Sequence, residues 1–327
     1  MSDTVNSIGV DVGGTKIAAG VVTDGGQVLA RERVATDSKA GYESVIRQIA
    51  ELARTVAQRA GLSLNCVRAV GLGMAGQIEV GTGIVHHAVN LFADRDIPLG
   101  PMLSEALRLP VVVDNDVRAS TLGEYLFGLA GRPASFLNVF AGTGVGSGFV
   151  DRGRLLRGAA NSACEIGHHS IDWQGLACGC GSRGCLELYA GGLGVARQAR
   201  EAMAADPDTL LWQLCEREPG RVDGRMVASA AGRGDATASG VIERAGQALG
   251  AGLANAANLL NPEVLMLGGG LMKLGEGFRK AALETFQSRA LATVRRSVRL
   301  EASRLADDAG FVGAASLWRV GPDGTIA

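Results

Sequence analysis

The sequence predicts an α/β protein made of two similar halves. Each half begins with the order strand, glycine-rich turn, strand, hairpin turn, strand: once at residues 7–34 and again at 136–158. This recurrence, about 130 residues apart, is a repeat of structure and not of letters. Helical patterns accompany the strands, which is typical of sheets covered by helices. A chain of 327 residues is long enough for two domains, each with its own core.

The elements of the first half follow from periodicity and turn residues. "SIGVDV" and "KIAAGVV" are apolar enough for buried strands, and Asp24-Gly25-Gly26 is a hairpin signal before "VLARERV". A helix is predicted where Val45, Ile49, Leu52 and Val56 recur at helical spacing. The remaining predicted elements are a strand with a glycine loop (67–76), a buried strand (109–116) and a helix (118–131).

The second half repeats the opening pattern and then diverges. Asp151-Arg152-Gly153 marks the hairpin turn of its strands. A segment rich in cysteine and histidine (164–187) comes next, followed by a long and mostly helical stretch. "VLMLGGG" (264–270) predicts one more strand with a glycine turn, and residues 307–320 predict a terminal helix.

Composition excludes several classes of protein. The formal net charge is −1, no run of five basic residues occurs, and aromatic residues make up 4%, so nucleic-acid binding is not expected. The N-terminus lacks the pattern of a signal peptide, and no run of 18 apolar residues indicates a membrane span. Six cysteines are too few for a disulfide scaffold. We therefore expect a cytoplasmic protein without membrane partners.

The first glycine loop, "DVGGTK", matches neither common phosphate-binding fingerprint. Both fingerprints place a helix after the glycines, whereas a strand is predicted after Lys16. A hairpin tip can still bind phosphate, because glycines let backbone amides approach anionic oxygens. Asp11 could hold Mg²⁺ directly or through water. The alternative is an ordinary turn, but a second glycine hairpin at Gly142-Thr143-Gly144-Val145-Gly146 favours two tips that clamp a polyphosphate.

"VDND" places Asp114, Asn115 and Asp116 directly after a buried strand. The carboxyl ends of parallel strands are where α/β proteins build their sites, and a carboxylate there can act as a general base. The alternative is that these residues cap the following helix. For Asp114 we favour capping, and for Asp116 both interpretations stay open.

A zinc site is predicted from H-x9-C-x-C-x4-C, formed by His168, Cys178, Cys180 and Cys185. Three thiolates and one imidazole make a closed structural set with no position for a reactive water. Glu165 and Glu187 bracket the segment, and if zinc folds it against a cleft their carboxylates could accept hydrogen bonds from the hydroxyls of a polyol, although surface exposure is the commoner fate.

Taken together, these motifs resemble the ROK family of sugar kinases and repressors, within the sugar kinase, hsp70 and actin superfamily. The resemblance rests on "DVGGTK", "VDND" with "LGE", "GTGVGSG", "EIGH", "CGCGSRGCLE" and "LGGG", in this order over nearly the whole chain. It implies two ribonuclease H-like (actin-like ATPase) domains flanking a cleft. The expected boundaries are 1–117 for an N-terminal α/β domain, with the C-terminal helix of about 306–320 packing back on it, and 118–305 for a larger domain that bears the zinc loop.

The resemblance also assigns residues. It implies Asp116 as the catalytic base that activates the 6-hydroxyl of a hexose. ATP would be bound through Asp11, Gly13, Gly14, Thr15, Lys16, Gly142, Thr143, Gly144, Gly146, Gly268, Gly269 and Gly270. The sugar would be bound through Gly76, Asn90, Asn115, Asp116, Glu165, His168 and Glu187, with His168 also on zinc.

Departures from the family pattern concern the substrate loops. "MAGQ" lacks the usual proline-glycine pair, and "AVNLFADRDIPL" departs from the usual "PNLPGW" stretch but keeps Asn90. Ser147 and Cys164 stand where glycine is common. We expect an ATP-dependent hexose kinase with glucose as its substrate and Mg²⁺ as a cofactor. N-acetylmannosamine, N-acetylglucosamine or another hexose as acceptor, and polyphosphate as donor, are alternatives.

A non-catalytic sugar sensor is the alternative from another class, and the intact Asp11 and Asp116 argue against it. Because the first phosphate motif starts at residue 11, we do not expect the N-terminal helix-turn-helix domain that the family's repressors carry. A homo-oligomer, dimer or tetramer, is expected by resemblance.

Overall fold

The computed structural model describes residues 5–88, 91–92, 95–129 and 132–327. Contacts along this chain form two compact units. The first runs to Asn138 and adds Gly148–Cys164 and Ser303–Ala327, and the second comprises Val139–Ser147 and Glu165–Ala302. The domain boundaries expected from the sequence stay a prediction, and one of them, at 117/118, falls inside a helix that starts at Asp116.

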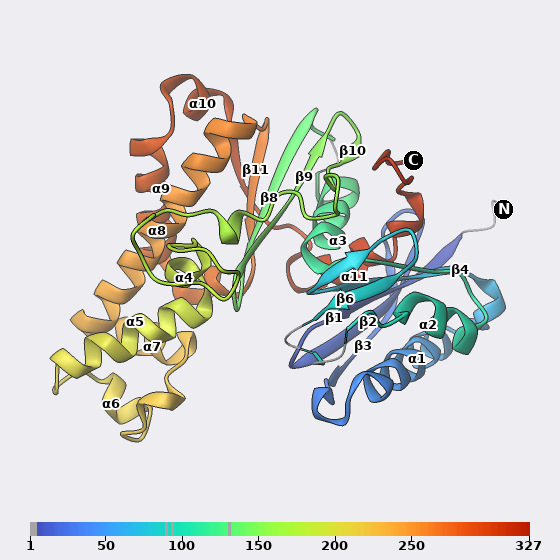
Figure 1. Cartoon of the computed structure of the whole chain (residues 1–327), viewed down its shortest axis with the longest axis horizontal. Coiled ribbons are helices and arrows are strands. Elements are labelled where there is room, and N and C mark those ends of the chain that lie inside the picture. The colour runs from blue at the N-terminus through green and yellow to red at the C-terminus, as the bar shows by residue number, and fades with distance from the viewer. Residues whose placement is uncertain (1–4, 89–90, 93–94, 130–131) are drawn as a thin grey trace. The chain divides into compact units, whose positions relative to one another are not determined.

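The first unit contains a five-stranded sheet in the order β3-β2-β1-β4-β7 (Figure 1). β1 pairs antiparallel with β2, and parallel with β4, which pairs parallel with β7. β5 and β6 form a separate small ribbon. The strands are β1 (Asn6–Val12), β2 (Lys16–Thr23), β3 (Val28–Ala35), β4 (Val67–Met74), β5 (Gln77–Glu79), β6 (Ile84–His87) and β7 (Val111–Asn115).

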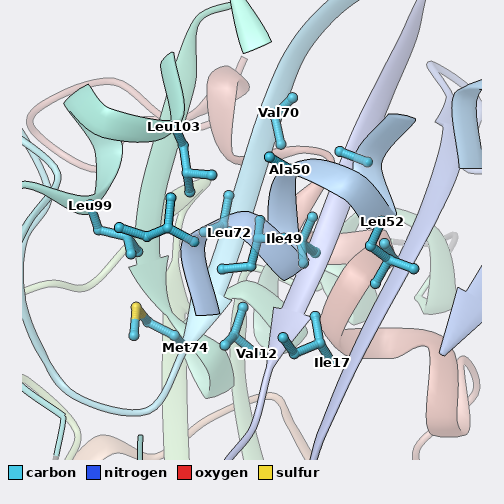
Figure 2. Packing of buried hydrophobic residues seen from close by; sticks show 14 of the residues in the cluster. Val12, Ile17, Ile49, Ala50, Leu52, Val70, Leu72, Met74, Leu99 and Leu103 are labelled. Atoms are coloured by element: carbon cyan, nitrogen blue, oxygen red, sulfur yellow. The ribbon is translucent and has the colours of Figure 1, made fainter. Parts of the chain in front are cut away.

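Helices cover both faces of this sheet. α1 (Tyr42–Arg59) and α2 (Leu99–Leu107) bury one face, where α1 contributes the predicted apolar stripe that includes Ile49 and Leu52 (Figure 2). α3 (Asp116–Gly123) and α11 (Ala309–Ala314) contact the strands from the other face. Because both faces are covered, the central strand β1 is mostly buried, whereas exposed and half-buried residues alternate along the edge strand β3.

Glycine allows α11 to pack directly on the backbone of the sheet. A Cβ on Gly9 would lie 1.7 Å from the carbonyl oxygen of Phe311, and one on Gly71 would lie 1.8 Å from that of Ala314. No side chain fits there, so these two strand glycines are requirements of the fold.

The second sheet has the order β10-β9-β8-β11-β12, which repeats the order of the first: third, second, first, fourth and fifth strand. The repeated meander expected from the sequence is therefore present, and Arg152 and Gly153 both have positive φ in its hairpin turn, as a type I′ turn requires. The strands are β8 (Ser135–Ala141), β9 (Val145–Asp151), β10 (Arg154–Leu155), β11 (Val264–Gly268) and β12 (Arg299–Ala302).

The second unit is mainly helical around α8, which contacts α4, α5, α7 and α9 (Figure 1). Asp235 caps α8 and accepts hydrogen bonds from the amides of Ala238 (2.7 Å) and Leu210 (2.6 Å) and from the hydroxyl of Thr209 (2.9 Å). Burial alone would raise the pKa of the Asp235 carboxyl, but these bonds together lower it. The helices are α4 (Glu187–Ala190), α5 (Gly192–Ala205), α6 (Leu211–Leu214), α7 (Gly224–Gly232), α8 (Ala236–Leu260), α9 (Glu276–Arg289) and α10 (Ala292–Ser297).

Two helices differ from the sequence expectation. The helix predicted over 118–131 is α3 followed by a π-helical turn, Glu124–Gly128. There the buried carboxylate of Glu124 accepts hydrogen bonds from the backbone amides of Arg304 and Leu305. The helix predicted over 307–320 is shorter, α11 followed by a 3₁₀ turn. Among the described residues, no helix is both long and apolar enough to cross a lipid bilayer.

Candidate active site

Polar residues of the first unit gather where β1, β4 and β7 end. These strands run parallel, and their register places Asp11 beside Gly73 and Gly73 beside Asp114. The loops that follow them therefore leave the sheet at one edge, the position at which α/β proteins bind ligands. The sheet thus brings together residues that are about 100 positions apart in the sequence.

The loop after β1 is a hairpin tip, as the sequence indicates. Val12 pairs with Ile17 across the turn, and the amide of Gly13 donates a hydrogen bond to the carbonyl oxygen of Lys16 at 2.9 Å. Thr15 and Lys16 are exposed. The hydroxyl and the ammonium group at this tip are therefore accessible to an anion.

Asp11 lies at the base of that tip and is half-buried. Burial, together with the carboxylate of Asp116, raises the pKa of Asp11 to about 6, while Lys16 and Arg33 act in the opposite direction. Gly310 leaves space for this carboxyl group, since a Cβ there would lie 2.7 Å from its Cγ atom. Two carboxylates close enough to influence each other form a site that a cation would stabilise.

Asn115 and Asp116 form the junction between β7 and α3. The side-chain oxygen of Asn115 caps α3, accepting hydrogen bonds from the amides of Val117 (2.9 Å) and Arg118 (3.1 Å). Asp116 is the first residue of the helix, is half-buried, and accepts a hydrogen bond from the amide of Val117 at 2.9 Å. The start of a helix favours a negatively charged side chain.

Asp114 does not cap the helix, contrary to the interpretation favoured from the sequence. It is fully buried, and its Oδ1 accepts a hydrogen bond from Nε of Arg118 at 2.7 Å. Its Oδ2 accepts two bonds from Arg157, from Nε at 3.1 Å and from Nη2 at 3.0 Å. The spacing of four between Asp114 and Arg118 is a signal that the sequence offered, but nothing in the sequence indicates Arg157.

The loop after β4 contains Gly76. A Cβ on Gly76 would lie 2.6 Å from the carbonyl oxygen of His87, so the loop and β6 are in close backbone contact. The predicted sugar ligand Asn90 lies outside the described residues.

The second glycine hairpin, in the second unit, connects β8 to β9. The amide of Gly142 donates to the carbonyl oxygen of Gly144 at 2.9 Å, and the amide of Gly192 donates to the carbonyl oxygen of Gly142 at 2.9 Å. Gly146 lies within β9. Helix α5 therefore starts directly at this hairpin.

The glycine turn after β11, Gly268–Gly270, lies beside the same hairpin. Gly269 has φ 97°, and a Cβ on it would lie 2.2 Å from the carbonyl oxygen of Ala141, the last residue of β8. Only glycine meets both conditions. Two of the three predicted nucleotide loops are thus neighbours within the second unit.

The four predicted metal ligands converge, with all their ligand atoms within 4.8 Å of one another. Cys178 Sγ is 3.8 Å from Nδ1 of His168, and the Sγ atoms of Cys180 and Cys185 are 3.6 Å apart. Burial, and then the neighbouring thiols, raise the pKa of Cys185 to about 12. The pKa of Cys180 is lowered, first by a backbone hydrogen bond from Ser182. Without a cation, these groups cannot all be thiolates at once.

Of the two bracketing glutamates, Glu187 lies with this cluster. Its Oε1 is 3.5 Å from His168 Nδ1 and 3.8 Å from Cys178 Sγ, and its Oε2 faces Gly144 of the hairpin. Glu165 is exposed and precedes the 3₁₀ turn Ile166–His168 without capping it by its side chain.

Comparison with known proteins gives one consistent family. The sequence profile of the ROK family matches residues 7–320. A glucokinase of Halalkalibacterium halodurans is 36% identical over 94% of this chain and 92% of its own length, and a glucokinase of Streptomyces coelicolor is 35% identical over 96% and 97%. The crystal structure of a ROK family glucokinase from Streptomyces griseus, in complex with glucose and AMPPNP, matches with a TM-score of 0.83 and 35% identity, over 95% of this chain and 98% of that one.

Proposed function

This chain belongs to the ROK family, and we propose that it is an ATP-dependent hexose kinase that phosphorylates glucose on its 6-hydroxyl. The proposal is carried by Asp116, a half-buried carboxylate at the start of α3, beside Asp11 and at the edge where the parallel strands end. The similarity to glucokinases supports the assignment of this chain as a sugar kinase, and it favours glucose as the proposed acceptor.

Asp116 would take the proton of the hexose 6-hydroxyl. As that oxygen forms its bond to the γ-phosphorus of ATP, the bond from this phosphorus to the bridging oxygen of ADP breaks. The proton moves to the Asp116 carboxylate, so charge and atoms balance. A positioned general base of this kind contributes about 10²–10⁴-fold in rate.

Magnesium fits the surroundings of Asp11. Mg²⁺ prefers oxygen ligands, and the half-buried Asp11 carboxylate repels that of Asp116 in the absence of a cation. When bound with ATP, Mg²⁺ neutralises charge on the phosphates. The amide of Gly14, the hydroxyl of Thr15 and the ammonium of Lys16 would orient the phosphates from the same hairpin, whereas the amide of Gly13 closes the turn.

Zinc fits the cluster of His168, Cys178, Cys180 and Cys185. Sulfur ligands of a tetrahedral Zn²⁺, each about 2.3 Å from the metal, lie about 3.7 Å apart, close to the 3.6 Å between Cys180 and Cys185. We propose one structural zinc, which would fix the segment that carries Glu187. It supplies no chemistry to the reaction, because four protein ligands leave no open position.

The hexose hydroxyls would be recognised by acceptor groups, the carboxylates, and by donor groups, a side-chain amide and an imidazole N–H. Asn115, Glu165, His168 and Glu187 are the residues proposed for its hydroxyls. Two of these residues, His168 and Glu187, lie close together within the second unit, with 3.5 Å between Nδ1 of His168 and Oε1 of Glu187.

A sugar panel tests this function. ADP release is measured with glucose, mannose, fructose, N-acetylmannosamine and N-acetylglucosamine, with ATP or polyphosphate as donor. We expect the highest kcat/KM with glucose and ATP. If an N-acetylated sugar is preferred, the acceptor is wrong but the kinase stands. If no sugar stimulates turnover while glucose still raises Tm, the chain is a sensor and not a kinase.

Replacing Asp116 tests the assigned base. Asp116→Asn keeps the size of the side chain and one acceptor oxygen but cannot accept the proton. We expect kcat to fall at least about 10²-fold, with glucose binding by calorimetry retained. Turnover close to that of the wild type would remove Asp116 from this role.

A further inference from the structure

The proposed chemistry leaves one buried ionic group of the first unit without a role, the triad of Asp114, Arg118 and Arg157. Asp114 has no exposed surface, and the side chains of Arg118 and Arg157 are 2% and 7% exposed. Two guanidinium groups thus share one carboxylate in the interior. Burying three charged groups carries a desolvation cost that offsets much of their mutual attraction, so stability alone does not account for the triad.

The triad encloses the junction that carries Asp116. Asp114 is in β7 and Arg118 is in the first turn of α3, so their 2.7 Å bond spans the three residues between them, with Asp116 at the centre. The same Oδ1 atom also accepts the amide of Asn115 at 2.7 Å. The backbone on both sides of Asp116 is therefore tied to a single carboxylate.

Arg157 fixes that carboxylate from the other side. Its Nε and Nη2 both donate to Oδ2 of Asp114, and its Nη1 donates to the carbonyl oxygen of Gly321 at 2.9 Å. The second arginine, Arg118, also donates to the carbonyl oxygen of Asn161 at 2.7 Å. Asp114 is thus held between the helix, the loop after β10 and the C-terminal segment, and it cannot rotate without breaking these bonds.

We propose that the triad is a clamp that sets the direction of the Asp116 carboxylate, with Arg157 as a positioning residue for phosphoryl transfer. This inference rests on the proposed function, in which Asp116 is the base. Displacing the base by about 1 Å can lower the reaction rate about 10²-fold, so loss of a clamp on its backbone should produce a measurable fall in kcat.

The test replaces Arg157 by methionine. Arg157→Met leaves Asp114 paired with Arg118, one carboxylate with one guanidinium, so no lone charge stays buried. We expect kcat to fall about 10- to 100-fold, with the KM values for glucose and ATP within about threefold of the wild type. The matched control is Arg154→Met, which removes an exposed ion pair to Asp323 of the same C-terminal segment and has no contact with Asp114. Its kcat should equal that of the wild type.

A double variant separates positioning from general damage. If Arg157 acts through Asp116, adding Arg157→Met to Asp116→Asn should cost little more than Asp116→Asn alone. Arg157→Lys keeps the positive charge but can bind Asp114 through only one nitrogen, so its kcat should lie between those of the wild type and Arg157→Met. It also carries the test if the methionine variant does not fold.

Three outcomes would overturn the clamp. They are a kcat of Arg157→Met equal to that of Arg154→Met, a loss that appears only as a raised KM for glucose, and losses that multiply in the double variant. Failure of the proposed function looks different, because no sugar would then stimulate turnover of the wild type, and failure of the assigned base would leave Asp116→Asn turning over at the wild-type rate.

Discussion

Gly142 and Gly144 lie two residues apart in one hairpin, but their α-carbons face different surroundings. A Cβ on Gly144 would lie 2.6 Å from Oε2 of Glu187, whereas one on Gly142 would meet nothing within 4 Å. The resemblance to the ROK family implies that both glycines bind the nucleotide. The structure indicates that Gly144 makes room for a proposed sugar ligand and that Gly142 leaves a surface open.

Gly144→Ala should therefore weaken sugar binding. The Glu187 oxygen would have to retreat by about 0.8 Å to reach the 3.4 Å at which ordinary contact begins. A hydrogen bond to a charged group is worth about 1.5–3 kcal/mol. Losing the one from Glu187 to glucose corresponds to a KM for glucose about 10- to 100-fold higher.

A coupled kinase assay, with glucose and ATP varied separately, measures this effect. The matched control is Gly142→Ala, which should leave the KM for glucose unchanged. Because its methyl group would enter open space at the proposed phosphate loop, it should raise the KM for ATP. The reasoning is refuted if Gly144→Ala leaves the KM for glucose unaltered, or if the two variants behave alike.

Two further predictions concern stability. Cys180→Ala should remove the bound zinc, lower Tm and weaken glucose binding. Cys66→Ala, at an isolated exposed cysteine, should have none of these effects. Elemental analysis that finds no zinc in the wild type purified without chelator would contradict the proposed zinc site. Asp235→Ala should cost about 2–4 kcal/mol in urea unfolding, against about 1 kcal/mol for Asp223→Ala, a cap that holds a single amide of its helix. Since folding lowers the pKa of the Asp235 carboxyl below its usual 3.8, its contribution to the free energy of unfolding is complete at neutral pH and is lost only as the pH falls below that value. The difference between Asp235→Ala and the wild type should therefore shrink below pH 3.8, and a difference that stays constant well below that pH would contradict this.

Much of the fold could be read along the chain because its signals are local. Turn residues at Asp24-Gly25-Gly26 and the helical spacing of Val45, Ile49 and Leu52 determine where elements start and end. The π-helical turn after α3 could not be predicted in this way. It forms where Glu124 accepts hydrogen bonds from residues about 180 positions later in the chain.

The candidate site divides in the same manner. The Cys/His spacing was sufficient to predict a cluster whose four ligand atoms converge, because its last three ligands lie within eight residues. Asn90 lies outside the described residues, so its role stays a prediction. The roles proposed for Asp116, Glu165 and Glu187 also stay predictions.

By itself, the sequence determined the repeated meander, the two glycine hairpins, the metal-ligand set and the family. Each of these depends on residue types at short, fixed spacing. Only the tertiary structure decided that Asp114 is the centre of a buried ionic triad and not a helix cap. The reason is that Arg157 reaches Asp114 from a loop 43 residues away, and a partner at that distance leaves no pattern in the local sequence. The same holds for Gly144, whose neighbour Glu187 is distant in the chain and is brought close only by packing.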